Sequence, residues 1–423
     1  MEASLSADRM QKIALFVSLS CVLQIAESIV PHPIPGLRLG LANMITLVAL
    51  VTLGFKAALE VALLRAILSS FLMGTFLSPP FVLSISGAFL STCAMGFLFW
   101  VSGSSSHYRF SLIGISILGA LCHNLTQLVL AYLILIKHEG VFVFLPWLCI
   151  GGVLMGWVTG AIARSVCIRL EHIGTMTEAA LTVSEGMPRP ESRHYVHRDS
   201  CIHQLSSKAK IAGCGILSLI LLISANLWLM LSLSGLLLAS MLLSRIPVSQ
   251  LLGRSRRYRW LLLTSFLIPA LLQGEGRPIF EIPYLTMTIE GVTYGFQFAF
   301  RLFYLMLLSF LLTMTTSLAD LANGLTGLLS FLRFFGISSK SVAAKLTLSW
   351  EAIPYLWETA RTSIRGARLE KKKRISHLVE WISNWVATLY VMADGTSRLW
   401  DLARVETIDE NLGSSVKEKA PFM

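Results

Sequence analysis

The chain has 423 residues, of which 54% are hydrophobic and only 14% are charged, and its mean hydropathy is +0.68. This composition excludes an ordinary water-soluble protein and predicts an all-α polytopic membrane protein, because it supplies several apolar segments of the ~20 residues that cross a bilayer. The net charge of +11 does not indicate a nucleic-acid partner, since the basic residues lie mainly in loops beside apolar segments, where they resist translocation and contact anionic lipid.

Six apolar segments occupy the first part of the chain and predict a six-helix bundle, which we assign to residues 1–173. The segments lie at roughly residues 12–30, 39–54, 57–75, 80–101, 110–136 and 146–166. Most basic residues of the connecting loops fall on one side, and only Arg38 and Lys137 fall on the other. Because cytoplasmic loops carry the excess of Lys and Arg, we expect both ends of the bundle to be cytoplasmic.

Residues 174–208 break the apolar pattern with proline, glycine and acidic residues, and we interpret them as a polar cytoplasmic linker. The linker contains four side chains of metal-ligand type, His194, His197, Cys201 and His203. Their spacing is loose and lacks a paired framework, so we favour a solvated linker over a metal site. The seven cysteines of the chain contain no CxxC pair, which argues against a disulfide framework or a zinc ribbon.

Four further apolar segments follow within residues 209–316. They lie at roughly residues 209–225, 227–244, 260–272 and 292–314. The loop between the second and third segments carries five arginines and no acid, whereas the loop after the third carries three glutamates. The first of these loops is therefore expected to be cytoplasmic, as is the C-terminus of the chain.

From Ser317 onward the sequence predicts amphipathic helices at or below the membrane, spanning residues 317–407 before a tail at 408–423. Leucines recur at helical spacing after Ser317, which can cap that helix together with Asp320. A second helix is expected from Ser339 past Arg365, and a third from about residue 377 to 404.

The usual enzymatic motifs are missing from the sequence. It contains no GxxxxGK[ST], HExxH or GxSxG, and no DDxxD that would place magnesium on a prenyl diphosphate. We therefore do not expect an enzyme, and we expect the energy for any work to arrive from a partner protein.

Polar side chains inside the first six segments are the candidates for a ligand site, because an ionisable group in hydrocarbon costs at least ~2.5 kcal/mol. His123, Asn124 and Gln127 share a helical face through their spacing. The full set of candidates is Glu27, Asn43, Arg65, Ser86, His123, Asn124 and Gln127, with Arg38 in a proline-rich outer segment that could cover the pocket. The structural alternative is that Arg65 pairs with Glu27 or Glu60 and that the amides hold helices together.

Several stretches of the first part resemble a known family. They are residues 27–36 and 39–43, Leu64-Arg65-Ala66, Ser84-Ile85-Ser86-Gly87 and residues 119–127. They are similar to the Gx transporter proteins, which also carry the label heptaprenyl diphosphate synthase component I. That family is thought to be related to the six-helix substrate-binding S components of energy-coupling factor (ECF) transporters, so the resemblance implies a substrate-binding bundle.

The second part resembles the T component of the same transporters, the CbiQ-type coupling protein. The resemblance rests on residues 315–321, on Ile353-Pro354 followed by residues 360–366, and on residues 392–404. It implies that Arg365, Gly366 and Arg404 dock onto two ABC-type ATPase subunits. Ile364 and Val405 depart from the two Ala-Arg-Gly motifs of that family, and the expected last transmembrane helix is missing. Without the resemblance, we would interpret these arginines as ordinary residues near a cytoplasmic helix end, which interact with the helix dipole and with lipid headgroups.

Together these features predict the membrane subunit of an ECF-type importer in the bacterial cytoplasmic membrane. Its partners would be a small-molecule substrate, the lipid bilayer and two ABC-type ATPase subunits, with ATP and Mg on the ATPases and no cofactor or metal on this chain. The substrate stays open among a vitamin-like compound, a flavin, a quinone or isoprenoid precursor, and a metal ion. The alternatives are a non-transporting subunit of a prenyl-lipid biosynthetic enzyme and a membrane scaffold with an inactive coupling domain.

Overall fold

The protein is described here from a computed structural model. The structure describes residues 2–29, 40–104, 110–136, 139–174, 200, 204–223, 227–244, 246, 249–250, 253, 259–272, 276–282, 285–317, 320–321, 324, 339–367, 383–384 and 386–387. Arg38, Arg404, the histidine-containing part of the linker and most of the predicted third amphipathic helix lie outside these residues.

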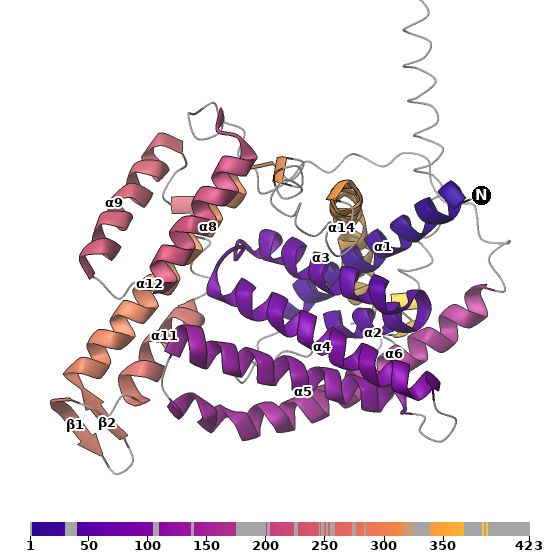
Figure 1. The fold of residues 1–423 in the computed structure, drawn as a ribbon, viewed down its shortest axis with the longest axis horizontal. Helices are drawn as coiled ribbons and strands as arrows, with labels where there is room; N and C mark the ends of the chain where they lie inside the picture. The colour runs from indigo at the N-terminus through magenta and orange to yellow at the C-terminus, as the bar shows by residue number, and fades with distance from the viewer. Residues whose placement is uncertain are drawn as a thin grey trace, which may run out of the picture.

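Each of the six apolar segments predicted in the first part forms a helix, and α1–α6 are called the N-terminal half below (Figure 1). Their bounds are α1 Glu2–Ile29, α2 Leu41–Leu53, α3 Phe55–Met73, α4 Pro79–Ser104, α5 Leu112–Leu130 and α6 Leu145–Gly174. The fifth predicted segment does not end as a regular α-helix. It continues as a π-helical stretch, Ala131–Ile136, and a 3₁₀ stretch, Glu139–Phe144, leads into α6.

Small residues allow α5 and α6 to pack very closely. A Cβ atom added to Gly156 would lie 2.6 Å from the Ile117 Cα, and one added to Gly160 would lie 2.7 Å from the Ile113 Cα. The two glycines are four residues apart and so face the same side of α6. Close backbone approach of this kind is the usual way in which helices associate in a membrane, where burial of apolar surface alone supplies little attraction.

The segments predicted within residues 209–316 also form helices, and α8–α14 are called the C-terminal half below (Figure 1). Their bounds are α8 Ser207–Ile223, α9 Leu227–Ser244, α11 Arg259–Leu272 and α12 Ile289–Thr315, followed by the amphipathic α14, Ser339–Ala367. The Tyr304 hydroxyl on α12 donates to the Leu233 carbonyl on α9 at 2.6 Å. The predicted Ser317–Asp320 cap is present, since the Asp320 N–H donates to the Ser317 hydroxyl at 3.2 Å.

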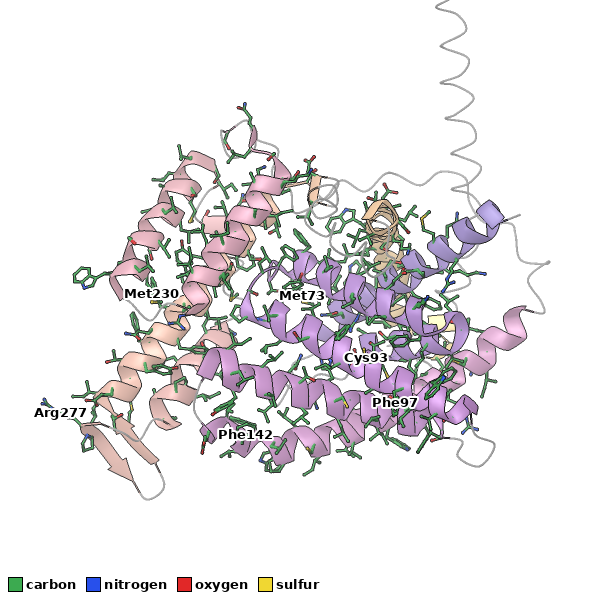
Figure 2. The ribbon with its side chains drawn as sticks, viewed as in Figure 1. Met73, Cys93, Phe97, Phe142, Met230 and Arg277 are labelled. Atoms are coloured by element: carbon green, nitrogen blue, oxygen red, sulfur yellow. The ribbon has the colours of Figure 1, made fainter. Side chains whose placement is uncertain are left out.

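A short hairpin between α11 and α12 was not predicted. Strands β1, Pro278–Ile282, and β2, Leu285–Thr288, pair antiparallel in a register that places Ile282 opposite Leu285. The hairpin leads directly into α12, whose first turn is capped by the Thr288 hydroxyl accepting from the Gly291 N–H at 3.0 Å. Figure 2 shows Arg277 at the start of the hairpin pointing away from the helices.

Five helical stretches of the described residues are long and apolar enough to cross a membrane. They are Arg9–Glu27, Pro79–Gly103, Leu112–Ile134, Glu139–Leu170 and Ile289–Thr315. These five stretches correspond to five of the ten apolar segments predicted from the sequence. Leu41–Leu53, Trp228–Ser244 and Leu262–Leu271 are shorter apolar helices, and α3 includes the charged residues Lys56, Glu60 and Arg65. The protein is nonetheless an all-α multi-pass membrane protein.

Large apolar side chains cover the outer face of α4 and α6. Trp100 is 66% exposed, Trp147 is 62% exposed and Phe97 is 62% exposed, and Figure 2 shows Phe97 at the periphery of the N-terminal half. Such an extended apolar surface is unfavourable in water. We assign this face to the lipid.

The two halves pack against one another, and α14 provides much of the contact by lying against α1 and α3. Val342, Leu346 and Ile353 of α14 belong to the same hydrophobic cluster as Val17 of α1 and Val61 of α3. In Figure 1, α4 and α5 run across the view, whereas α8 and α12 lie to their left and are inclined steeply to them. The helices of the two halves therefore do not share one common axis.

Candidate functional site

A polar pocket with a volume of about 70 Å³ lies within the N-terminal half. All six helices contribute to it. Six of the eight predicted ligand-binding residues line it: Glu27, Asn43, Arg65, His123, Asn124 and Gln127. The sequence therefore identified much of a surface that is assembled from positions up to 100 residues apart, although their role in binding stays a prediction.

Glu27 joins the end of α1 to the start of α2. Its Oε1 accepts a hydrogen bond at 2.9 Å from the backbone N–H of Gly40, and only 4% of the residue is exposed. Gly40 has a φ of 76°, in the left-handed region that favours glycine. The carboxylate thus satisfies a backbone donor beside the first turn of α2 and places a negative charge at the pocket wall.

Arg65 brings a buried positive charge to the same wall. Its Nη2 donates to the Asn43 Oδ1 at 2.9 Å, and the residue is 5% exposed. Glu60 was one of the two acids expected to pair with Arg65 if the role of Arg65 were structural. The Glu60 carboxylate is paired with Lys345 of α14 instead. A guanidinium whose fork is held by an amide oxygen is oriented to bind an anionic or carbonyl group.

His123 and Gln127 line the pocket from α5. Their Nε2 atoms are 3.0 Å apart, as their i,i+4 spacing predicts. Gly87 of α4 makes room for this pair, because a Cβ atom at that position would lie 2.8 Å from the His123 Nδ1. The glycine of the motif Ser84-Ile85-Ser86-Gly87 thus leaves the space that His123 occupies beside α4.

Asn124 also holds two helices together, which was the structural alternative predicted for the amide side chains. Its Nδ2 donates to the Leu148 carbonyl of α6 at 2.9 Å. Nearby, the Ser116 and Thr159 hydroxyls are 3.0 Å apart and join the same two helices. These contacts position α5 against α6 and so hold one side of the pocket.

Ser86 on α4 was predicted to bind the ligand, but the pocket is lined instead by Ser84, Ser91 and Met95 of that helix. At about 100° per residue, Ser86 points well away from Ser84, while Ser91 and Met95 return to the Ser84 face. Helical spacing relative to Gly87 could have indicated this face.

Gln24 was also missed. It lies one turn before Glu27 and lines the pocket, it is 8% exposed, and its Oε1 has no hydrogen-bond partner among the residues that the structure describes. A buried amide oxygen without a partner costs about 1–3 kcal/mol. This acceptor therefore indicates a place for a ligand donor or a bound water.

No cluster of three or more His, Cys, Asp or Glu side chains with metal-binding geometry occurs among the described residues. Within the pocket lining, Glu27 and His123 are the residues of these types. The four metal-ligand-type residues of the linker lie outside the described part of the chain.

The predicted ATPase-contacting residues fall at the end of the chain that the structure describes least. Arg365 and Gly366 lie in the last turn of α14, which ends at Ala367. The helix thus extends from the interface with α1 and α3 to the Ala-Arg-Gly-like motif. Arg404 lies outside the described residues.

Comparison with known families divides the chain in two. Residues 16–166 match the family described as heptaprenyl diphosphate synthase component I, and residues 198–393 match the family described as cobalt transport protein. These matches agree with the two resemblances found in the sequence.

Curated relatives carry the name energy-coupling factor transporter transmembrane protein EcfT. The protein from Thermanaerovibrio acidaminovorans is 30% identical over 181 residues, which are 42% of this chain and 67% of the relative. The proteins from Bacillus selenitireducens and Bacillus subtilis are 26% and 27% identical over 40% and 39% of this chain. The chain spans 63% and 62% of the length of these two relatives, which is less than two thirds. The chain therefore belongs to the energy-coupling factor transporter transmembrane proteins, as a fusion of a heptaprenyl diphosphate synthase component I-like N-terminal half with a cobalt transport protein-like C-terminal half.

Proposed function

We propose that this chain is the membrane subunit of an ECF-type importer, in which the N-terminal half binds a small molecule and the C-terminal half couples it to two separate ABC-type ATPase subunits. The observation that carries the proposal is the polar pocket, which contains a buried arginine and a buried glutamate inside a lipid-facing bundle. Buried ionisable groups in a membrane are costly and are retained mainly where they serve a function.

The lining favours a compact ligand with anionic and hydrogen-bonding groups. Arg65 supplies a positive charge, and amides and hydroxyls supply donors and acceptors around it. Among the residues that the structure describes, Met95 and Met155 are the large apolar side chains of the lining, and no Phe, Tyr or Trp among these residues lines the pocket. This chemistry does not suit a long prenyl chain, so it argues against the biosynthetic alternative that the description of the first family would suggest.

The position of α14 supports the coupling role. Its N-terminal part packs on α3 and on α1, and α1 is the helix that contributes Gln24 and Glu27 to the pocket. The last turn of α14 contains Arg365. An arginine at a helix tip is well suited to dock into a carbonyl- or carboxylate-lined groove of a partner. Movement of that partner would then be transmitted along α14 to the substrate-binding half, and the ligand would be released to the cytoplasm as that half reorients in the membrane.

The pocket is tested by native mass spectrometry of the purified full chain, followed by extraction and identification of any bound small molecule. Wild type is compared with Arg65→Met, which removes the charge and keeps much of the side-chain volume, and with the exposed-site control Lys56→Glu. The proposal predicts a co-purifying compound in wild type and in the control that is lost in Arg65→Met. Equal occupancy in all three proteins would contradict it.

A further inference from the structure

A buried lysine interrupts the apolar face that α14 presents to the N-terminal half. Val342, Leu346 and Ile353 lie on this face in the hydrophobic cluster shared by both halves. Lys345 lies between them and is only 6% exposed. A charge at such a position requires an opposite charge close by, because its desolvation is otherwise not compensated.

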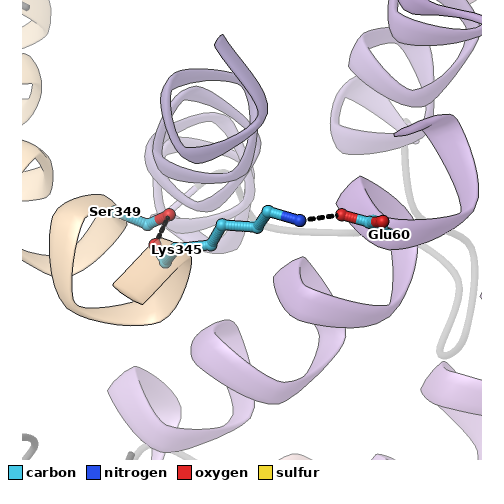
Figure 3. Close-up of polar contacts among 3 residues, drawn as sticks. All are labelled: Glu60, Lys345 and Ser349. Carbon is cyan, nitrogen blue, oxygen red and sulfur yellow. Dashed lines mark hydrogen bonds and ion pairs between the residues drawn. The ribbon is translucent and has the colours of Figure 1, made fainter. Parts of the chain in front are cut away.

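Glu60 of α3 supplies this opposite charge. Figure 3 shows Lys345 reaching from α14 to Glu60, with which it forms an ion pair. The two residues are 285 positions apart in the chain, so the pair joins the C-terminal half to the N-terminal half. The side chains are 8% and 22% exposed, which places the contact largely inside the interface.

A second polar contact fixes the same part of α14 to α1. The Ser349 hydroxyl, one turn after Lys345, lies 2.9 Å from the Ala14 carbonyl of α1 and 2.6 Å from the Lys345 carbonyl of its own helix, and it shares its one proton between these two acceptors. Ser349 is fully buried. Lys345 and Ser349 thus contact two different helices of the N-terminal half from adjacent turns. The polar groups define both the position and the register of α14, which an apolar face alone would define less strictly.

An apolar helix face accepts many partners, whereas a buried lysine penalises every partner that lacks a carboxylate at the matching place. We propose that the Glu60–Lys345 pair is a specificity determinant that selects the N-terminal half of this chain as the occupant of α14. It excludes other membrane domains of similar shape that do not carry an acid at this position. The inference rests on the interface and not on the content of the pocket, so it can fail or succeed independently of the proposed function.

Charge reversal in full-length chains with two different affinity tags tests this selection. In Glu60→Lys alone two lysines meet, and in Lys345→Glu alone two glutamates meet, so each variant is mismatched within its own chain. When the two variants are co-expressed, each N-terminal half matches the α14 of the other chain. We expect recovery of one tag with the other to rise about tenfold over either variant expressed with itself, which corresponds to about 1.4 kcal/mol.

The matched controls reverse exposed charges on the same two helices. Lys56 of α3 and Glu358 of α14 are exposed, and co-expressed Lys56→Glu and Glu358→Lys should show no such increase. A chain that carries both Glu60→Lys and Lys345→Glu should regain the wild-type Tm and show no increase in cross-tag recovery.

Two results would overturn the proposal. The first is cross-tag recovery that is no higher for the complementary variants than for the exposed controls. The second applies if the single variants fail to fold: the doubly reversed chain then decides, and failure of that chain to regain the wild-type yield and Tm would contradict selection by this pair.

Discussion

The Glu27 carboxylate accepts a hydrogen bond from the backbone N–H of Gly40 at 2.9 Å. This contact links a charged side chain of the pocket to the start of the next helix, 13 positions further along the chain. The same carboxylate therefore shapes the pocket and holds α2 in place, and the two roles can be separated by substitution.

Glu27→Gln should separate them, because its amide oxygen can still accept from Gly40 while the negative charge is lost. Glu27→Ala removes the acceptor and leaves the Gly40 N–H without it, at a cost of about 1–3 kcal/mol in the free energy of unfolding. Thermal unfolding in detergent should show a clearly lower Tm for the alanine variant than for the glutamine variant. Equal Tm values would show that the Gly40 contact does not stabilise the fold.

Gly87→Ala should disturb the pocket from α4. The added methyl group would lie 2.8 Å from the His123 Nδ1, so the imidazole must move or the helices must separate, at a cost of about 1–3 kcal/mol. We expect weaker retention of any co-purifying ligand together with a lower Tm. Gly103→Ala on the same helix is the control, since a Cβ atom there has no neighbour within 4 Å, and it should leave both measurements unchanged.

Gly74→Ala should weaken the contact between the two halves. Gly74 follows α3 with a φ of 70°, and a Cβ atom there would lie 2.2 Å from the Phe310 ring of α12. Gly40→Ala provides a matched control, because Gly40 is also left-handed with a φ of 76° and an added Cβ there would lie no closer than 3.9 Å to its neighbours. Both variants should lose about 1 kcal/mol through backbone strain, and Gly74→Ala should lose about 1–3 kcal/mol more through the clash.

Phe310→Leu tests this assignment when it is combined with Gly74→Ala. The smaller side chain should recover part of the stability that Gly74→Ala loses, which a double-mutant cycle of Tm values would detect as non-additivity. Purely additive effects would show that the ring of Phe310 is not the obstacle.

Gly156→Ala should separate α5 from α6, because the added Cβ would lie 2.6 Å from the Ile117 Cα, which is backbone and cannot rotate away. We expect a loss of about 1–3 kcal/mol, measured as a lower Tm. Gly213→Ala on α8 has open space around the added Cβ and should be neutral or slightly stabilising. A similar Tm for the two variants would contradict the close packing of α5 on α6.

The helices and part of the pocket could be predicted because their signals are local or physically costly. Apolar segments of membrane length gave the six N-terminal helices, and ionisable residues such as Glu27 and Arg65 stood out against hydrocarbon. His123 and Gln127 were paired by their spacing alone.

Other features depended on tertiary contacts that no local pattern reveals. The partner of Glu60 is Lys345 in the other half, and only the folded chain brings α14 to α3. The sequence around Gln24 is that of an ordinary polar residue in a helix, and only the folded structure shows that Gln24 lines the pocket with a buried Oε1. The β1–β2 hairpin occupies short segments, which carry too little periodicity to be distinguished from a loop.

The coupling of this chain to ATPases is the central claim, and co-purification of the tagged full chain with ABC-type ATPases of its host tests it most directly. Wild type is compared at matched expression with Arg365→Glu, Arg404→Glu and the exposed control Glu358→Lys. We predict that wild type and the control recover ATPase subunits and that Arg365→Glu loses them, since the reversed charge at the tip of α14 cannot enter the same groove. Absence of ATPases from the wild-type preparation, or their full retention by both arginine variants, would contradict the account.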